Sequence, residues 1–203
     1  LPRERTLELL RSIYAESSED ELLEMMNYIK RRKNEEMMGG TMSRGKRKNK
    51  NLAKKAATYL RKSDGPRVAV FEVNGFDTHA AQGGVDGTHT KCLVEMDDII
   101  KNLKTNLKEA YKDTIILTVT EFGRTIKQNG GNGTEHGYGT AIFMAGGLLK
   151  KSQVHTDWPG LKRKEMYEGR DLNATIDARS VYASAMSTVF DLDFKRIQKD
   201  VFW

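Results

Sequence analysis

Three short stretches of this 203-residue chain combine side chains that bind metal ions or transfer protons. Asp77 and His79 are two residues apart, so in an extended chain they project to the same side. Glu121 and Arg124 follow an apolar run, and His136 lies in a glycine-rich loop. A carboxylate beside an imidazole suits a divalent metal ion or a proton-transfer pair. The alternative for Asp77 and His79 is an Asx turn with a surface histidine.

The glycine-rich loop, residues 129–139, contains five glycines and presents Glu135 next to His136. Short apolar runs at residues 115–119 and 141–145 lie on either side of this region. Apolar runs that end in ionisable side chains are typical of the active-site edge of an α/β protein. The alternative is a solvated loop between two core strands.

The order of the expected elements places the charged stretches together. A β-rich run at Val68–Val73 precedes an expected helix at Thr90–Ala110, with Thr88 as its cap, and an expected strand at Thr114–Val119. Strand–helix–strand order predicts parallel strands joined by a right-handed crossover. Both charged turns follow the carboxyl ends of strands, so we expect them to meet at one sheet edge. The predicted fold class is α/β, with a mostly parallel sheet flanked by helices.

The first third of the chain differs in charge from the rest. Residues 1–66 hold 16 Lys and Arg against 10 Asp and Glu, whereas residues 67–203 hold 18 of each kind. Apolar residues at three- and four-residue steps predict a helical hairpin within residues 6–38. We therefore expect a basic helical segment at residues 1–66 and an α/β domain at residues 67–203.

The basic excess is concentrated in Arg44–Lys62, which contains nine basic residues and no acidic one. Such a run can bind nucleic acid or an anionic membrane surface. The favoured alternative is a docked helix whose lysines face water. That helix would have a narrow apolar stripe, formed by Leu52, Ala56, Tyr59 and Leu60. Because Tyr59 is the single aromatic residue in the run, a base-stacking surface is poorly supported.

Further features limit the possible classes of protein. The single cysteine, Cys92, excludes an intrachain disulfide and a multi-cysteine metal site, and we expect it in the core. No apolar run approaches the roughly 18 residues that span a bilayer, and no signal peptide is visible. Because the chain begins with leucine, we expect a processed product or a fragment.

Asp177 is expected to cap a helix at Ala178–Phe190. His89 and His155 are expected to be surface residues.

Several motifs together resemble one known family, "domain of unknown function 1501". They are NGFDTHAAQ, TVTEFGRT, NGGNGTEHGYG, FMAGG and DLNATIDARSVYASAM, within about residues 52–192. That family is placed in the alkaline phosphatase and sulfatase superfamily, and its members are usually longer and often exported from bacterial cells. The resemblance implies the C-terminal half of an alkaline phosphatase-like fold, with metal ions at the C-terminal strand edge, and an exported or periplasmic location.

The resemblance also implies roles for individual residues. Asp77 and His79 resemble the first carboxylate–histidine pair of metal ligands, and His136 resembles a later histidine ligand. Glu121 is similar to the Asp of an Asp-His motif, but Phe122 replaces the histidine and weakens a second metal site. No counterpart of the superfamily's Ser, Thr or modified Cys nucleophile is found in this sequence.

The sequence therefore predicts a metal-dependent, hydrolase-like domain that acts on small anionic phosphate or sulfate esters. Two imidazoles with carboxylates favour zinc, with manganese as the alternative. Glu121 and Arg124 are the expected catalytic residues. Arg124 would hold a tetrahedral anion in a bidentate contact, or alternatively form a salt bridge with Glu121 or Glu135. Phe122 and the missing nucleophile favour a second hypothesis, a non-catalytic member of the same fold used for binding or assembly.

Overall fold

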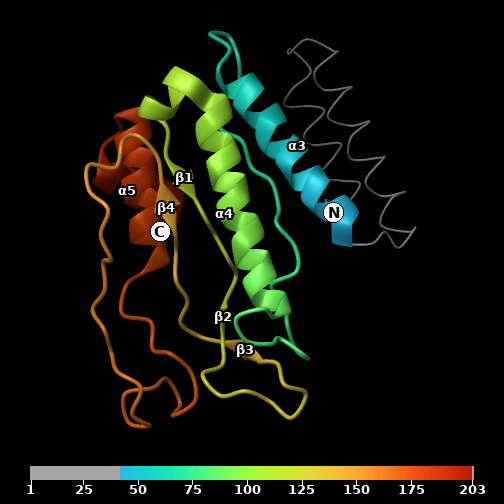
Figure 1. Ribbon diagram of the computed structural model, residues 1–203. Helices are drawn as coiled ribbons and strands as arrows, with labels where there is room; N and C mark the ends of the chain where they lie inside the picture. Colours follow the sequence, from blue (N-terminus) through green and yellow to red (C-terminus); the bar gives the residue numbers. More distant parts are fainter. Residues whose placement is uncertain (1–41, 203) are drawn as a thin grey trace, which may run out of the picture. The chain divides into compact units, whose positions relative to one another are not determined.

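The structure is a computed structural model that describes residues 42–202, with side chains from residue 49 onward. The chain divides after Arg47 into two units, and the packing described below belongs to the second, which begins at Lys48. The helical hairpin predicted within residues 6–38 lies outside the described residues. The elements follow one another as α3 (Met42–Leu60), α4 (Thr88–Leu107), the 3-10 helix η1 (Lys108–Asp113), β1 (Ile116–Leu117), β2 (Gly123–Arg124), β3 (His136–Gly137), β4 (Met144–Ala145), α5 (Ala178–Phe190), α6 (Phe194–Ile197) and the π-helix η2 (Gln198–Phe202) (Figure 1).

The core of the second unit lies where α3 packs against α4 (Figure 1). Ala53 and Ala57 of α3 are fully buried against Ile99, Leu103 and Leu107 of α4. Residues four apart share one face of a helix, and small side chains let two helices approach closely. Ala56 and Leu60 of the predicted stripe pack against this core, although its centre on α3 is formed by the two alanines.

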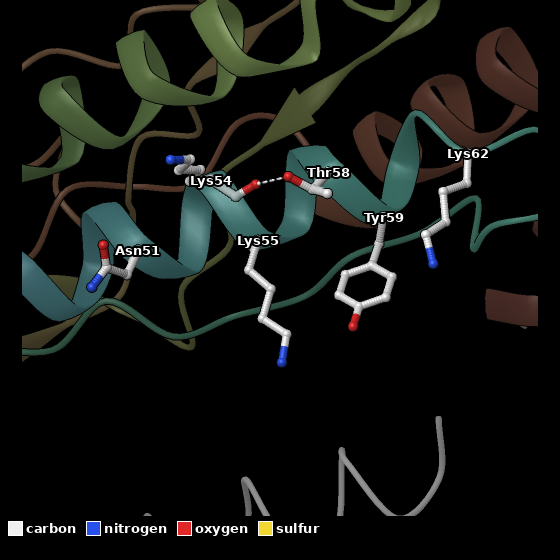
Figure 2. A pocket seen from close by; sticks show the side chains of 6 residues that line it. All are labelled: Asn51, Lys54, Lys55, Thr58, Tyr59 and Lys62. Carbon is white, nitrogen blue, oxygen red and sulfur yellow. Dashed lines mark hydrogen bonds between the residues drawn. The ribbon is translucent and has the colours of Figure 1, made fainter. Parts of the chain in front are cut away.

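Helix α3 carries most of the basic run, and its Lys50, Lys54 and Lys55 side chains are exposed. Lys50 forms an ion pair with Asp98 of α4 at 3.3 Å. Lys55 and Lys62 lie beside the ring of Tyr59, with their Nζ atoms 5.7 and 4.7 Å from its centroid (Figure 2). Cations at the ring compete with a nucleic-acid base for the same aromatic surface. The docked-helix interpretation is confirmed by the packing, and nucleic-acid binding stays a prediction.

The strands do not form the predicted, mostly parallel sheet. Within residues 42–202 they form two antiparallel pairs, β1 with β4 and β2 with β3. In these pairs Ile116 is opposite Ala145, and Arg124 is opposite His136. The prediction of an alkaline phosphatase-like α/β fold with a mostly parallel sheet is therefore wrong.

The physical reason lies in Val68–Val73, which the sequence predicts as the first parallel strand. The segment forms no strand, and within the described residues no backbone hydrogen bond joins it to a strand. Phe71 and Val73 pack on the α3–α4 core, whereas Val70 is 91% exposed. An apolar run of this kind buries alternate side chains equally well on a sheet or on a pair of helices. In this structure the segment packs on helices α3 and α4 instead of pairing with a strand.

The predicted helices agree with the structure more closely than the predicted sheet does. Helix α4 has Gly87 as its N-cap, so Thr88 is the first helical residue and not the predicted cap. The α-helix ends at Leu107, and the chain continues as η1. Helix α5 has the predicted bounds, and Asp177 Oδ1 accepts a hydrogen bond from the backbone N–H of Arg179 at 2.9 Å.

Two further predictions concern burial and membranes. Cys92 is buried, and its Sγ donates to the carbonyl oxygen of Gly75 at 3.2 Å, which confirms a core position. Among the helices of residues 42–202, none combines the length and apolar character needed to cross a bilayer.

Candidate metal centre

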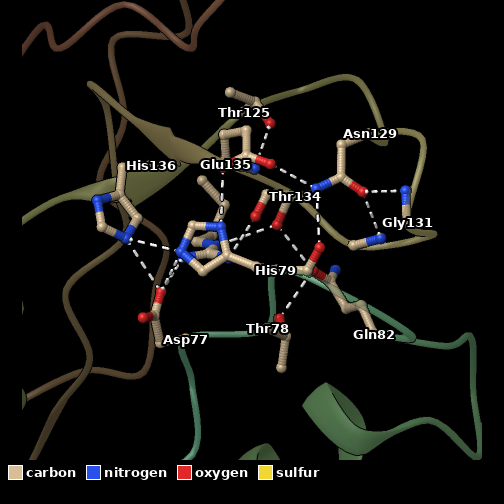
Figure 3. Close-up of polar contacts among 12 residues, drawn as sticks. Asp77, Thr78, His79, Gln82, Thr125, Asn129, Gly131, Thr134, Glu135 and His136 are labelled. Carbon is tan, nitrogen blue, oxygen red and sulfur yellow. Dashed lines mark hydrogen bonds and ion pairs between the residues drawn. The ribbon is translucent and has the colours of Figure 1, made fainter.

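Asp77, His79 and His136 bring one ligand atom each to a common point (Figure 3). Asp77 Oδ1 lies 2.9 Å from His79 Nε2 and 3.0 Å from His136 Nε2. The two nitrogens are 3.0 Å apart. Ligand atoms around a tetrahedral zinc ion, with bonds of about 2.0–2.1 Å, are separated by about 3.3 Å. The triangle of atoms is therefore close in size to one face of a tetrahedral site.

Two segments far apart in the sequence hold this triangle together. The residues that follow Asp77 pair with the glycine-rich loop, and the Thr134 N–H donates to the carbonyl oxygen of Thr78 at 3.1 Å. Gly133 lies so close to His79 that a Cβ atom would be 2.2 Å from the His79 carbonyl carbon. Only glycine permits this approach of two backbones.

Asn129 shapes the glycine-rich loop from within (Figure 3). Its Oδ1 accepts hydrogen bonds from the N–H groups of Gly131 and Gly133, both at 2.9 Å, in an Asx-type turn. Its Nδ2 donates to the carbonyl oxygen of His79 at 2.8 Å and to the Glu135 carboxylate. One side-chain amide thus ties the loop to the histidine backbone and orients Glu135.

Glu135 determines which nitrogen of His79 carries the proton. Glu135 Oε2 lies 2.8 Å from His79 Nδ1, and since an ionised carboxylate only accepts, Nδ1 must donate. Hydrogen bonds from Asn129, and secondly from His79, lower the pKa of Glu135, which keeps the carboxylate ionised. In neutral His79 the Nε2 lone pair then faces the triangle, as metal ligation requires.

Arg124 contacts Asp77 and Thr134, and its side chain is 18% exposed. Its Nη1 donates to Asp77 Oδ1 at 2.7 Å, its Nε donates to Thr134 Oγ1 at 3.0 Å, and its Nη2 donates to the Thr134 carbonyl oxygen. The hydrogen bond from Arg124, and secondly that from His136, lower the pKa of Asp77. Asp77 is therefore the carboxylate partner of Arg124, and it remains ionised and able to bind a cation.

The three converging atoms have more lone pairs than protons. Asp77 Oδ1 only accepts, His79 Nε2 carries a lone pair in the neutral ring, and His136 Nε2 has at most one proton. Arg124 donates to Asp77 Oδ1 and so satisfies part of this acceptor capacity, and a cation or an additional proton would satisfy the rest. Two imidazoles and one carboxylate form a three-ligand set that zinc uses in catalytic sites. The residues therefore fit a divalent metal ion.

The sequence of this chain matches one family of proteins over most of its length. The sequence profile of a family described as "Protein of unknown function (DUF1501)" matches residues 4–198. The chain belongs to the DUF1501 family. The match begins far upstream of the region that carries the motif resemblance, so the basic N-terminal segment is part of the DUF1501 sequence. No curated protein and no solved structure matches this DUF1501 chain.

Glu121 and Phe122 lie just before β2 in the DUF1501 chain. Glu121 is exposed and is not a member of the group of ligand atoms found within the described residues. Phe122 stacks on the ring of His136, with centroids 3.9 Å apart and planes inclined by 24°. The structure thus brings together three of the four predicted ligands and leaves Glu121 outside.

Sequence reasoning missed two contacts of this centre, those of Glu135 and Phe122. Glu135 was visible as the neighbour of His136, but nothing in its spacing indicated a hydrogen bond to His79, which is 56 residues away. Phe122 was noticed only as a missing ligand. The Phe122 contact depends on the register of β2 and β3, and the Glu135 contact depends on the pairing of residues 78–82 with the glycine-rich loop. Local patterns encode neither of these pairings.

His89, predicted as a surface residue, is partly buried. Its ring packs edge-on against Phe76 with centroids 5.7 Å apart. Its Nδ1 is buried and has no hydrogen-bond partner among the described residues. Burial first, and the charge of Arg124 second, lower the pKa of His89. The folded chain of this DUF1501 member thus favours the neutral imidazole.

Acidification is therefore expected to destabilise the fold through His89. Because its folded-state pKa lies below the unfolded value of about 6.5, the unfolded state binds more protons as the pH falls. The contribution of neutral His89 to the free energy of unfolding is complete above the unfolded-state pKa. It is lost as the pH falls through the folded-state pKa. In urea unfolding between about pH 7 and 5, His89→Phe should reduce the pH dependence of the free energy of unfolding. The exposed control His155→Phe should retain it; equal slopes in the two variants would contradict the prediction.

Proposed function

We propose that this chain is a metal-dependent hydrolase that acts on phosphate or sulfate esters. A zinc or manganese ion would be held by Asp77, His79 and His136. The supporting observation is the convergence of their three ligand atoms to within 3.0 Å, at a site where the Asp77 side chain is 65% exposed. Catalytic zinc sites use three protein ligands and keep another position open. Exposure of the ligands supports such an open position.

The charges around the centre favour an anionic substrate. Asp77 and Glu135 are ionised, Arg124 is cationic, and a divalent ion makes the sum of these charges positive. A bound ion of this kind polarises a phosphoryl or sulfuryl oxygen and lowers the pKa of water. The side chains around it orient the ligands, since Arg124 holds Asp77 and Glu135 holds His79 with Nε2 unprotonated. The proposal depends on the three ligand atoms and on the charges around them, and it does not depend on an alkaline phosphatase-like fold.

A metal-binding, non-catalytic role is the second candidate, and the hydroxyl groups beside the centre favour it. Thr78 and Thr134 are only 6% and 8% exposed. Their Oγ1 atoms donate to Gln82 Oε1 at 2.9 and 2.7 Å. A buried hydroxyl that is already engaged is a poor nucleophile. These two hydroxyls therefore offer no nucleophile, and direct attack by water is an alternative route to ester hydrolysis.

The deciding experiment is an assay of aryl phosphate and aryl sulfate esters with added zinc or manganese. Wild type is compared with Asp77→Asn, which weakens a ligand, and with Asp157→Asn, the same change at an exposed loop position. A hydrolase is expected to show metal-stimulated activity that Asp157→Asn retains and Asp77→Asn loses. Equal, trace activity in all three proteins would refute the hydrolase, and metal uptake by the wild type would then support the binding role.

A further inference from the structure

The three ligand side chains of the centre are oriented by different kinds of contact. Glu135 accepts a hydrogen bond from His79, and Arg124 donates one to Asp77. His136 differs from both, because its Nδ1 forms no hydrogen bond with any residue of the described part of the chain. Ligating histidines ordinarily donate from their second nitrogen to a partner that fixes the ring. Another contact must therefore orient this imidazole.

That contact is the stacked ring of Phe122, and the register of β2 and β3 explains it. Arg124 is opposite His136, and Gly123 is opposite Gly137, in an antiparallel pair. Side chains alternate along an extended chain, so Phe122 and Arg124 lie on the same face. Phe122 is then the diagonal neighbour of His136, a separation that an aromatic side chain can reach. The resulting ring stack has centroids 3.9 Å apart.

Close packing next to Phe122 fixes the backbone from which its ring extends. A Cβ atom on Gly123 would lie 1.8 Å from the carbonyl oxygen of Gly139, so the two backbones are in direct contact there. Phe122 is 38% exposed, so most of its surface is covered by neighbouring groups. One of these neighbours is the His136 imidazole, so the stacked phenyl ring limits the orientation of that imidazole.

We propose that Phe122 is a positioning residue that holds the His136 ring with Nε2 directed into the metal centre. The phenyl ring takes the place of the missing hydrogen-bond partner. The inference rests on the metal centre proposed above and adds to it the determinant of one ligand's orientation. One short segment, Phe122–Arg124, then orients two of the three ligands, because Arg124 holds Asp77.

Zinc titration of matched variants provides the first test. Phe122→Leu keeps an apolar side chain but removes the ring, and should weaken zinc binding by about 10-fold, at the lower end of the roughly 10–100-fold effect of outer partners. Phe122→Tyr keeps the ring and should restore wild-type affinity. Phe143→Leu makes the same substitution at another exposed phenylalanine and should have no effect. Wild-type affinity in Phe122→Leu would overturn the proposal.

Nuclear magnetic resonance of the metal-free protein provides a second test that does not depend on zinc. Ring current from the stacked phenyl group shifts the ring protons of His136 upfield. In Phe122→Leu these signals should move downfield, while those of the distant, exposed His155 stay in place. If the wild type binds no zinc, the proposed function fails, and the His136 signals still decide the role of Phe122. Unchanged His136 signals in Phe122→Leu would refute that role.

Discussion

Replacement of His136 by alanine is expected to lower the affinity of the chain for zinc by more than about 100-fold. Loss of an outer partner already costs roughly 10–100-fold, and loss of a direct ligand should cost more. Asp77 and His79 would remain, which is one ligand fewer than a catalytic zinc site uses. The measurement is isothermal titration of protein purified without chelator. His155→Ala removes an exposed imidazole and should bind zinc like the wild type.

The same titration at decreasing pH tests which ligands release the ion. Ligating histidines must be neutral, so metal binding competes with their protonation. Asp77 does not compete over the same range, because Arg124 and, secondly, His136 lower its pKa. Affinity should therefore fall as the pH is lowered, because protons compete with the ion for its ligand atoms. Zinc binding that survives unchanged in His136→Ala would show that the ion occupies another part of the chain.

Gly133→Ala is expected to disrupt both the fold around the centre and metal binding. The added Cβ would lie 2.2 and 2.3 Å from the carbonyl carbon and oxygen of His79, and 2.5 Å from the nitrogen of Ala80. These are backbone atoms, which cannot turn aside as a flexible side chain can. The glycine-rich loop must then move away from His79, and the contacts of Asn129 with both segments are lost. Overpacking of this kind costs about 1–3 kcal/mol.

Gly130→Ala is the matched control, because nothing lies within 4 Å of its added Cβ. Its free energy of unfolding should differ from wild type by no more than about 0.5 kcal/mol. Urea unfolding and zinc titration of both variants separate a general loop effect from close packing at Gly133. Equal stability and equal zinc affinity in the two variants would show that the loop does not depend on that packing.

The group of candidate ligands was predictable because its chemistry is concentrated in short stretches. Asp77 and His79 are two residues apart, and His136 follows a run of glycines and asparagines. The carboxyl ends of parallel strands predicted that Asp77 and His79 would meet the Glu121–Arg124 turn, and the family resemblance added His136 to this group. The residues do meet, but through pairing of the Thr78–Gln82 segment with the glycine-rich loop. The prediction of proximity was confirmed for these residues, although the fold used to reach it was wrong.

The sheet was not predictable from the same patterns. The Val68–Val73 run satisfies the composition of a buried strand, but composition does not say whether its partner is a strand or a helix pair. The pairing of β1 with β4 joins segments separated by the Glu121–Arg124 turn and the glycine-rich loop. Helix α5 was predicted to the residue because its capping aspartate and its apolar period are local.

The large sequence separation within the centre determines the order in which it can assemble. His136 is 57 residues from His79 and 59 from Asp77, and α4 lies within the intervening chain. Closing so long a loop costs more conformational entropy than closing the hairpin of β2 and β3, and distant contacts form slowly. The hairpin can therefore form before the Asp77–His79 segment joins it. An ion has no complete binding site until that late step, so it would stabilise the finished fold by mass action and could not serve as an early template for folding.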